Sequence, residues 1–415
     1  MTKSTRTQTG QRRLNVMALF AELLTLAVIA LAICAEAATA AGAAYAVPAP
    51  LKPAVPGAVI RTLALTSSAA LPSAARNLLV LYHSRTADGA DIAVSGTLAT
   101  PRGRPPAGGW PVIVWTHGTT GMAADCAPSR DTFAGPEHAY LGLTEALLDD
   151  YVKRGYAVAA TDYAGLGTSG AQPYLLGVDE GRNALDLLRA ARAIDPGIGP
   201  RYVVMGHSQG GQSALFTSAI AASYAPELTL LGGVAVAPAS HVPQIIGRIS
   251  TSTRPMPTLV FGVYVLEAYA SRHPEMHLET VLSAQAISHL GDLQNGCFDQ
   301  AASAGYWSAA DPSRQFTHPF EPSMLPGLSL ATDPGQLRIE APTFVAQGLE
   351  DAFIPAAATR DVAARLCRAG APLLYRTYAG ESHVGVLSRS KDDAAAWVAD
   401  RFAGRPAPSN CGELL

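Results

Sequence analysis

Short apolar runs alternate along the chain with longer segments of helical periodicity. Short apolar runs predict sheet strands at 111–115, 157–161, 202–205, 233–237, 343–347 and 373–378. The run at 111–115 is rich in β-branched residues, which is typical of a strand buried on both faces of a sheet. Apolar residues at helical spacing predict helices at 142–154, 181–193, 209–224, 356–367 and 391–402. Strands and helices that alternate in this way build a mostly parallel central sheet with helices on both faces. The pattern therefore predicts an α/β fold.

Two parts of the chain depart from this alternation. Residues 77–84 and 92–100 flank the turn Thr86-Ala87-Asp88-Gly89 and predict a hairpin, after an extended, Pro- and Ala-rich lead-in at 47–75. Between two predicted sheet strands lies the segment 240–336, which is too long for a loop and has helical patterns at 264–272 and 279–290. We expect a helical cap domain at 240–336, inserted between two parts of the core at 47–239 and 337–415.

The first 46 residues have the features of an export signal. An apolar stretch at 23–34 follows the basic residues Lys3, Arg6, Arg12 and Arg13. The stretch is too short to cross a bilayer comfortably, and small-residue exits follow at Ala38-Thr39-Ala40 and Ala44-Tyr45-Ala46. We interpret 1–46 as a signal peptide, which predicts a secreted protein of the extracellular space or cell envelope. A retained membrane anchor is the alternative.

Composition narrows the possible classes of protein. Of the 415 residues, 48% are hydrophobic and 15% are charged, which indicates a large buried core. The net charge is −3 and no basic patch is visible, so nucleic acid is not an expected partner. Outside the leader the cysteines are Cys126, Cys297, Cys367 and Cys411. An even number in an exported chain indicates two disulfides, with three possible pairings, and free buried cysteines are the alternative.

The string Gly206-His207-Ser208-Gln209-Gly210 stands between a predicted strand and a predicted helix. A tight strand-to-helix turn there would lift the Ser208 hydroxyl above the edge of the sheet. The start of the following helix favours developing negative charge. We therefore predict that Ser208 is a catalytic nucleophile. The alternative is a buried structural serine in a glycine turn.

A serine nucleophile needs a base and an acid, which follow it in the order Asp or Glu, then His. His383 is the histidine that follows a late sheet strand, in Gly380-Glu381-Ser382-His383-Val384. The loop after the preceding strand offers Glu350 and Asp351. We choose Asp351 as the residue that orients the imidazole and expect Glu350 to be solvated. An exposed loop histidine is the alternative reading of His383.

Two backbone N–H groups should stabilise the oxyanion. The first is that of Gln209, and the second belongs to the loop Thr116-His117-Gly118-Thr119-Thr120-Gly121, where we choose Thr119 and rank Gly118 next. His117 is expected to support this loop through hydrogen bonds. No His, Cys, Asp or Glu cluster has metal-ligand spacing, and the glycine-rich string 165–170 lacks nucleotide-binding spacing. We expect no metal and no cofactor.

Several strings together resemble the secretory lipase family of the α/β-hydrolase superfamily. They are Asp125-Cys126-Ala127-Pro128-Ser129, residues 156–170 ahead of Pro173-Tyr174-Leu175, residues 206–211, and the loops of Asp351 and His383. The resemblance covers nearly all of 75–404. It implies an α/β-hydrolase fold, a signal peptide, no metal, a helical cap over the acyl site, and lipase or esterase activity. It also implies a disulfide from Cys126 to Cys297, which leaves Cys367 with Cys411.

The expected reaction is two-step acyl transfer from a carboxylic ester, through an acyl-enzyme on Ser208. The rivals are an amidase or peptidase, an acyltransferase, and a non-catalytic surface protein. We expect a small-molecule or lipid ester substrate, transient contact with a lipid interface, and a monomer. Five apolar residues of the expected cap line an acyl tunnel or form a helix core: Leu259, Phe261, Val263, Val265 and Leu266.

Overall fold

The computed structural model describes residues 42–415, and the compact unit of interest is Val47–Leu415. The signal-peptide prediction falls on residues 1–46 and lies almost wholly outside the described residues. Within 42–415, no helix is both long enough and apolar enough to cross a membrane.

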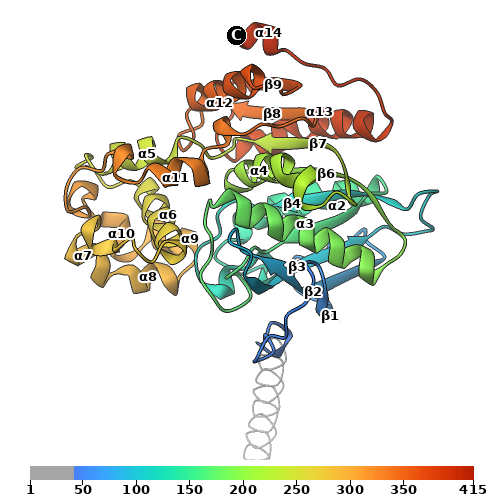
Figure 1. The fold of residues 1–415 in the computed structure, drawn as a ribbon, viewed down its shortest axis with the longest axis horizontal. Coiled ribbons are helices and arrows are strands. Elements are labelled where there is room, and N and C mark those ends of the chain that lie inside the picture. The colour runs from blue at the N-terminus through green and yellow to red at the C-terminus, as the bar shows by residue number, and fades with distance from the viewer. Residues whose placement is uncertain (1–41) are drawn as a thin grey trace, which may run out of the picture. The chain divides into compact units, whose positions relative to one another are not determined.

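A nine-stranded sheet forms the centre of the unit, in the order β1-β2-β3-β5-β4-β6-β7-β8-β9 (Figure 1). The strands are β1 (Val59–Ala64), β2 (Arg76–Arg85), β3 (Asp91–Thr100), β4 (Trp110–Thr116), β5 (Ala157–Thr161), β6 (Ile198–His207), β7 (Thr229–Val236), β8 (Thr343–Gly348) and β9 (Leu373–Tyr378). The pairs β1–β2, β2–β3 and β3–β5 are antiparallel, and all others are parallel. The prediction of a mostly parallel sheet is confirmed.

Helices cover both faces of this sheet. They are α2 (His138–Lys153), α3 (Gly177–Ile194), α4 (Gln209–Tyr224), α12 (Ala356–Arg368), α13 (Gly385–Phe402) and, after them, α14 (Cys411–Leu414). Helices α2 and α13 pack on one face, where Ile113 and Trp115 of β4 are buried. Helices α3 and α4 pack on the other face, against Val112 and Val114. Alternate residues of one strand therefore enter two cores, which explains the unbroken apolar runs in the sequence.

The expected lead-in at 47–75 contains a strand that the sequence did not reveal. Strand β1 has mostly exposed or half-buried residues and pairs only with β2, at the edge of the sheet. An edge strand buries little apolar surface, so it leaves no clear alternation of apolar and polar residues.

Helix α2 begins at His138, four residues before the predicted start at 142. His138 and Tyr140 therefore belong to the helix.

Between β7 and β8 the chain builds a helical segment, 240–336, beside the sheet; it appears in yellow to orange in Figure 1. Its helices are α5 (Val242–Ile249), α6 (Thr258–Arg272), α7 (Ala284–Ser288), α8 (Leu290–Gln294), α9 (Phe298–Ser303), α10 (Gly305–Ala309) and α11 (Pro326–Thr332). Short 3₁₀ turns lie at Leu278–Thr280, Pro312–Arg314, Pro322–Met324 and Pro334–Gln336, and two more precede α2 at Ala124–Cys126 and Pro128–Arg130.

The prediction of one helix at 279–290 is wrong. The chain forms a 3₁₀ turn at Leu278–Thr280, and α7 starts only at Ala284. Leu282 instead makes a β-bridge with Phe316, and the Ser283 hydroxyl accepts a hydrogen bond from the Ala286 N–H. A serine cap and a tertiary backbone pairing thus interrupt a pattern that looked continuous in the sequence.

Two disulfides are present. Cys126 is bonded to Cys297 with a Cα–Cα distance of 5.4 Å, and Cys367 is bonded to Cys411 at 5.5 Å. These are the pairs that the family resemblance implied. The first pair joins the loop after β4 to the helical segment, where the Phe298 N–H also donates to the Thr120 carbonyl at 2.9 Å.

Candidate active site

Ser208 lies in the turn between β6 and α4, in a strained backbone conformation with φ 58° and ψ −118°. Positive φ is costly for a residue with a side chain, so the surrounding structure must hold it. Glycine is required on both sides, because a Cβ at Gly206 would collide with the Gly210 carbonyl and one at Gly210 with the Thr116 carbonyl. The predicted tight turn is confirmed, and it places Ser208 at the end of β6, inside the sheet.

The structure brings Ser208, His383 and Asp351 together from three different loops. Nε2 of His383 lies 2.8 Å from Ser208 Oγ, and Nδ1 lies 2.6 Å from Asp351 Oδ2. A carboxylate only accepts, so Nδ1–H donates to Asp351. Nε2 is then free to accept the hydrogen of the Ser208 hydroxyl. The arrangement can abstract a proton from Ser208.

Asp351 is buried and fully engaged. Its Oδ1 accepts the N–H groups of Phe353 and Ile354 at 2.9 and 2.8 Å, and its Oδ2 accepts the side-chain amide of Gln347 at 2.9 Å. Burial alone would raise the pKa of Asp351, but its hydrogen bonds and the charge of His383 outweigh burial, so the pKa lies below its usual value. Asp351 therefore stays ionised and can stabilise an imidazolium.

The neighbouring carboxylate, Glu350, is exposed to solvent, and its backbone N–H donates to the Glu381 carbonyl at 3.0 Å. Of the two candidates in this loop, only Asp351 reaches His383. Asp351 is the residue that we chose from the sequence, and the direction of the backbone after β8 turns it toward His383 and leaves Glu350 in solvent.

His207 connects the loop of His383 with the loop after β4. Its Nε2 lies 2.8 Å from the His383 carbonyl, and its Nδ1 lies 3.1 Å from Tyr140 Oη. Tyr140 Oη in turn accepts the Gly118 N–H at 2.9 Å. Burial first, and the nearby His383 second, lower the pKa of His207 to about 3, so it remains neutral. Sequence reasoning missed the roles of both residues, because Tyr140 belongs to no motif and His207 occupies a variable position of the nucleophile string.

The hydrogen bond from the Gly118 N–H to Tyr140 Oη distinguishes the two candidate oxyanion donors in the loop after β4. Because the Gly118 N–H is already engaged by Tyr140, Thr119 remains the candidate of the loop. Its hydroxyl lies 2.6 Å from Tyr174 Oη, which holds the residue in place. The Gln209 N–H occupies the first position of α4, where a backbone donor has no partner within its own helix. His117, buried in the loop, has Nδ1 2.6 Å from the Gly118 carbonyl.

A buried glutamate supports the residue that follows the nucleophile. Glu180 Oε1 accepts the side-chain amide of Gln209 at 2.6 Å and the Leu175 N–H at 3.0 Å. Burial raises the pKa of Glu180 well above its usual value, so its carboxyl group remains neutral over a wider pH range. The signal in the sequence was Gln209 itself, a polar residue at the start of a buried helix that needs a partner.

Two cavities meet at Ser208. The first has an empty volume of about 510 Å³ and is almost wholly apolar; its lining includes Ser208, Ile245, Thr258, Phe261, Gly262, Val265 and Ile354. The second, of about 580 Å³, lies on the His383 side; its lining includes Thr119, Glu137, Tyr140, Phe298, Asp299 and His383. Phe261 and Phe353 border both cavities, and their rings meet edge to face at 5.8 Å. Burial raises the pKa of Glu137 in the second cavity to about 8.

The five apolar residues suggested as acyl-tunnel lining divide between two roles. Phe261 and Val265 border the apolar cavity, one helical turn apart on α6. Leu259, Val263 and Leu266 are fully buried in the core of the helical segment. A single helix thus supplies both the wall of the cavity and the core behind it.

Comparisons with known proteins agree with this architecture. The secretory lipase family model matches residues 139–410. A secreted triacylglycerol lipase of Malassezia globosa is 27% identical over 312 residues, covering 70% of this chain and 66% of the relative, which is just under two thirds of its length. A protein of Mycobacterium tuberculosis named as a probable inactive lipase is 24% identical over 376 residues, covering 87% of this chain and 82% of that relative.

Among solved structures, Candida antarctica lipase A in its closed state superimposes with a TM-score of 0.74 at 18% identity, covering 89% of each chain. At this identity the likeness shows the fold, which is that of the α/β-hydrolases, with a sheet and surrounding helices as predicted. The family model covers well over half of the chain. The chain therefore belongs to the secretory lipase family.

Proposed function

We propose that this protein is a serine carboxylic-ester hydrolase, a lipase or esterase, that acts through Ser208, His383 and Asp351. The observation that carries the proposal is the continuous path Ser208 Oγ–His383 Nε2 at 2.8 Å and His383 Nδ1–Asp351 Oδ2 at 2.6 Å. Acyl transfer to serine needs this order of nucleophile, base and orienting acid. Family membership and the name of the Malassezia relative support the ester as the bond that is cleaved.

In the first half of the reaction, His383 Nε2 takes the Ser208 proton while Oγ attacks the ester carbonyl carbon. The N–H groups of Gln209 and Thr119 stabilise the oxyanion. The imidazolium, held by ionised Asp351, then protonates the leaving alkoxide. In the second half, His383 takes a proton from water, the resulting hydroxide attacks the acyl carbon, and Ser208 Oγ leaves with the proton from His383.

The cavities give the two halves of the substrate separate places. The cavity bordered by Ile245, Phe261 and Val265 is almost wholly apolar, and we assign it to the acyl chain. The cavity on the side of His383 takes the alcohol, because the leaving oxygen must reach Nε2. In this proposal the segment 240–336 acts as a cap, since α5 and α6 supply half of the residues that line the apolar cavity.

Secretion belongs to the same proposal. The Malassezia relative is named as secreted, and the two disulfides fit an oxidising compartment. The basic and apolar residues at the start of the chain are of the kind that directs export.

The direct test is the reaction of the purified protein with a fluorophosphonate probe and with p-nitrophenyl esters. We expect the probe to label Ser208, and Ser208→Ala to lose label and at least about 10³-fold in ester turnover. Ser223→Ala, an exposed serine on the same helix α4, is the matched control and should keep both. Equal turnover of a p-nitroanilide would identify an amidase instead. An unlabelled wild type would place the chain with its relative named as probably inactive.

A further inference from the structure

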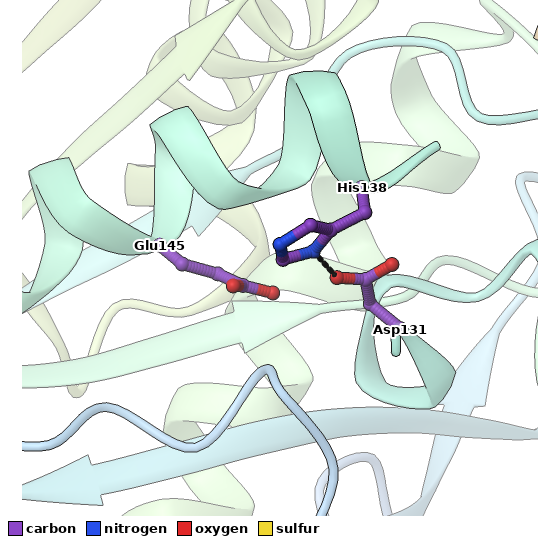
Figure 2. A group of neighbouring side chains, drawn as sticks. All are labelled: Asp131, His138 and Glu145. Carbon is purple, nitrogen blue, oxygen red and sulfur yellow. Dashed lines mark hydrogen bonds and ion pairs between the residues drawn. The ribbon is translucent and has the colours of Figure 1, made fainter. Parts of the chain in front are cut away.

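Three potential metal ligands converge outside the candidate active site. They are Asp131, His138 and Glu145, whose nearest ligand atoms all lie within 4.8 Å of one another (Figure 2). Asp131 follows the 3₁₀ turn Pro128–Arg130, and His138 is the first residue of α2. Glu145 comes two turns later on the same helix, so it shares a face with His138. In Figure 2 all three side chains point into one small space between the turn and the helix.

This grouping differs from the expectation of no metal cluster. The three residues are spaced seven apart in the chain, and no common metal motif has that spacing. The early start of α2, at His138, is what turns His138 and Glu145 into helical neighbours. The turn before the helix then brings Asp131 back toward them.

The chemistry of the three groups suits a divalent transition metal. One imidazole nitrogen and two carboxylates form a mixed set that Zn²⁺ accepts, whereas Ca²⁺ and Mg²⁺ prefer oxygen alone. The Asp131 side chain is 2% exposed and that of His138 is 26% exposed, so the site is anchored inside and reachable from solvent. Three protein ligands leave a coordination position for water.

The arrangement also holds negative charge that a cation would balance. His138 Nδ1 lies 2.5 Å from Asp131 Oδ2, and the Glu145 carboxylate lies within 4.8 Å of both side chains. Two carboxylates this close repel each other when both are ionised, and one imidazole offsets that repulsion only in part.

We propose that Asp131, His138 and Glu145 form a structural binding site for a divalent transition-metal ion of the Zn²⁺ type. On binding, the ion takes the Nδ1 lone pair of a neutral His138 ring that carries its proton on Nε2. The proton between Nδ1 and Asp131 is released to solvent from a doubly protonated ring, or moves to Nε2 through solvent from a neutral one, as Asp131 and Nδ1 move apart. With metal–ligand bonds of about 2.0–2.1 Å, the ligand atoms of a tetrahedral site lie roughly 3.3 Å from each other. His138 Nδ1 and Asp131 Oδ2, now 2.5 Å apart, therefore need to separate by less than an ångström. Glu145 supplies the third ligand.

The position of the site suggests its role. Asp131 Oδ2 also accepts the Ser68 hydroxyl at 2.8 Å, and the Ser68 N–H donates to the Asp131 carbonyl at 3.2 Å. A metal here would tie the lead-in before β2, the turn at Asp131 and the start of α2 together. Tyr140, in the same first turn of α2, holds the Gly118 N–H beside Ser208. The ion would thus stabilise the helix end that supports the candidate oxyanion loop.

The test is calorimetric titration of Zn²⁺ into the chelator-treated full-length protein, with thermal unfolding in parallel. We expect one tight site in the wild type and a Zn²⁺-dependent rise in the melting temperature. Glu145→Gln keeps the shape of the side chain and should weaken that site at least about tenfold and abolish the rise. His138→Gln is the second variant and should do the same. Asp150→Asn, a carboxylate on the same helix outside the cluster, is the matched control and should bind as wild type does.

Surface pairs could also take Zn²⁺ weakly, notably His273 with Glu275, His277 with Glu279, and His289 with Asp292. The triple variant His273→Ala, His277→Ala and His289→Ala removes these surface pairs and should retain the tight site, which distinguishes the proposed site from them. Affinity and thermal shift that survive in Glu145→Gln and vanish in the triple variant would overturn the proposal, as would the lack of any tight site. Because no turnover is measured, the outcome is independent of the proposed esterase activity.

Discussion

Tyr140 Oη lies 3.1 Å from Nδ1 of His207 and accepts the Gly118 N–H at 2.9 Å. Through His207, whose Nε2 faces the His383 carbonyl at 2.8 Å, this tyrosine joins the loop of the candidate oxyanion hole to the loop of the base. Two loops that are far apart in the chain are thereby held in a fixed relative position. Small displacements of one loop against the other should slow the reaction, because a reacting geometry tolerates little displacement.

Tyr140→Phe removes this link while keeping the ring. We expect kcat on a short soluble ester to fall by about tenfold with a smaller change in KM, because the donors and the base lose their alignment. The free energy of unfolding should fall by about 1–2 kcal/mol, since the buried Gly118 N–H loses its acceptor. Tyr151→Phe is the control: Tyr151 is buried on the same helix, and its hydroxyl has no hydrogen-bond partner among residues 42–415. Wild-type kcat in Tyr140→Phe would show that the link has no influence on the reaction.

Glu180 should act as a positioning residue through Gln209. Glu180→Leu removes the acceptor of the Gln209 side chain, so we expect kcat to fall on the order of tenfold or more as the first turn of α4 shifts. Glu180→Gln retains an acceptor oxygen and resembles the neutral carboxyl group, so it should restore activity to within about threefold of wild type.

Recovery of kcat in Glu180→Gln is the decisive comparison. A purely structural defect would change the melting temperatures, and the loss of kcat would not depend on whether residue 180 carries a hydrogen-bond acceptor. Asp179→Asn, at the adjacent buried carboxylate that pairs with Arg272, serves as control and should leave kcat unchanged. If Glu180→Leu and Glu180→Gln gave equal kcat values, the hydrogen bond to Gln209 would not be the cause.

Ile245→Trp tests the assignment of the apolar cavity to the acyl chain. Ile245 borders that cavity and is only partly buried, so a larger side chain can project into the space. We expect kcat/KM for octanoyl and longer esters to fall on the order of tenfold or more, while acetyl and butyryl esters are hydrolysed as before. Leu330→Trp, at an exposed site of α11, is the control. An equal loss for all chain lengths would mean that the acyl chain lies elsewhere.

His207 should make the stability of the protein depend on pH. Burial lowers the pKa of His207 to about 3, against about 6.5 in an unfolded chain. Below about pH 6.5 the unfolded chain therefore binds a proton at His207, whereas the folded chain keeps His207 neutral. The contribution of His207 to the free energy of unfolding is complete above about pH 6.5 and is lost as the pH falls toward 3. Its size is on the order of 1 kcal/mol per pH unit within that window.

Urea unfolding from pH 7.5 to pH 4.5 measures this slope. Stability of the wild type should fall more steeply than that of His207→Gln, whatever the absolute stability of the variant. His277→Gln, at an exposed histidine, should keep the wild-type slope. Parallel slopes for the wild type and His207→Gln would contradict a neutral, buried His207.

Much of the architecture can be predicted from the sequence. Strands β4, β5, β8 and β9 lie within one residue of their predicted bounds at each end, because each contains a short apolar run. Strands β4, β5 and β8 are almost wholly buried, whereas the edge strand β9 exposes Arg376 and Thr377. Ser208, Asp351 and His383 were found because each follows a sheet strand, and the ends of parallel strands meet at one edge. Edge strand β1 and the broken helices of 278–290 escaped, since their pairing depends on partners far away in the chain.

The sequence by itself determined the order of strands and helices, the nucleophile turn and the candidate triad, because local apolar periodicity and glycine sterics act over a few residues. Only the tertiary structure decided that Gly118 is engaged by Tyr140 and that Glu180 supports Gln209. It also gathered Asp131, His138 and Glu145 at one point. The physical reason is that hydrogen bonds and ligand sets depend on side-chain direction and ångström distances, which packing fixes and sequence spacing does not encode.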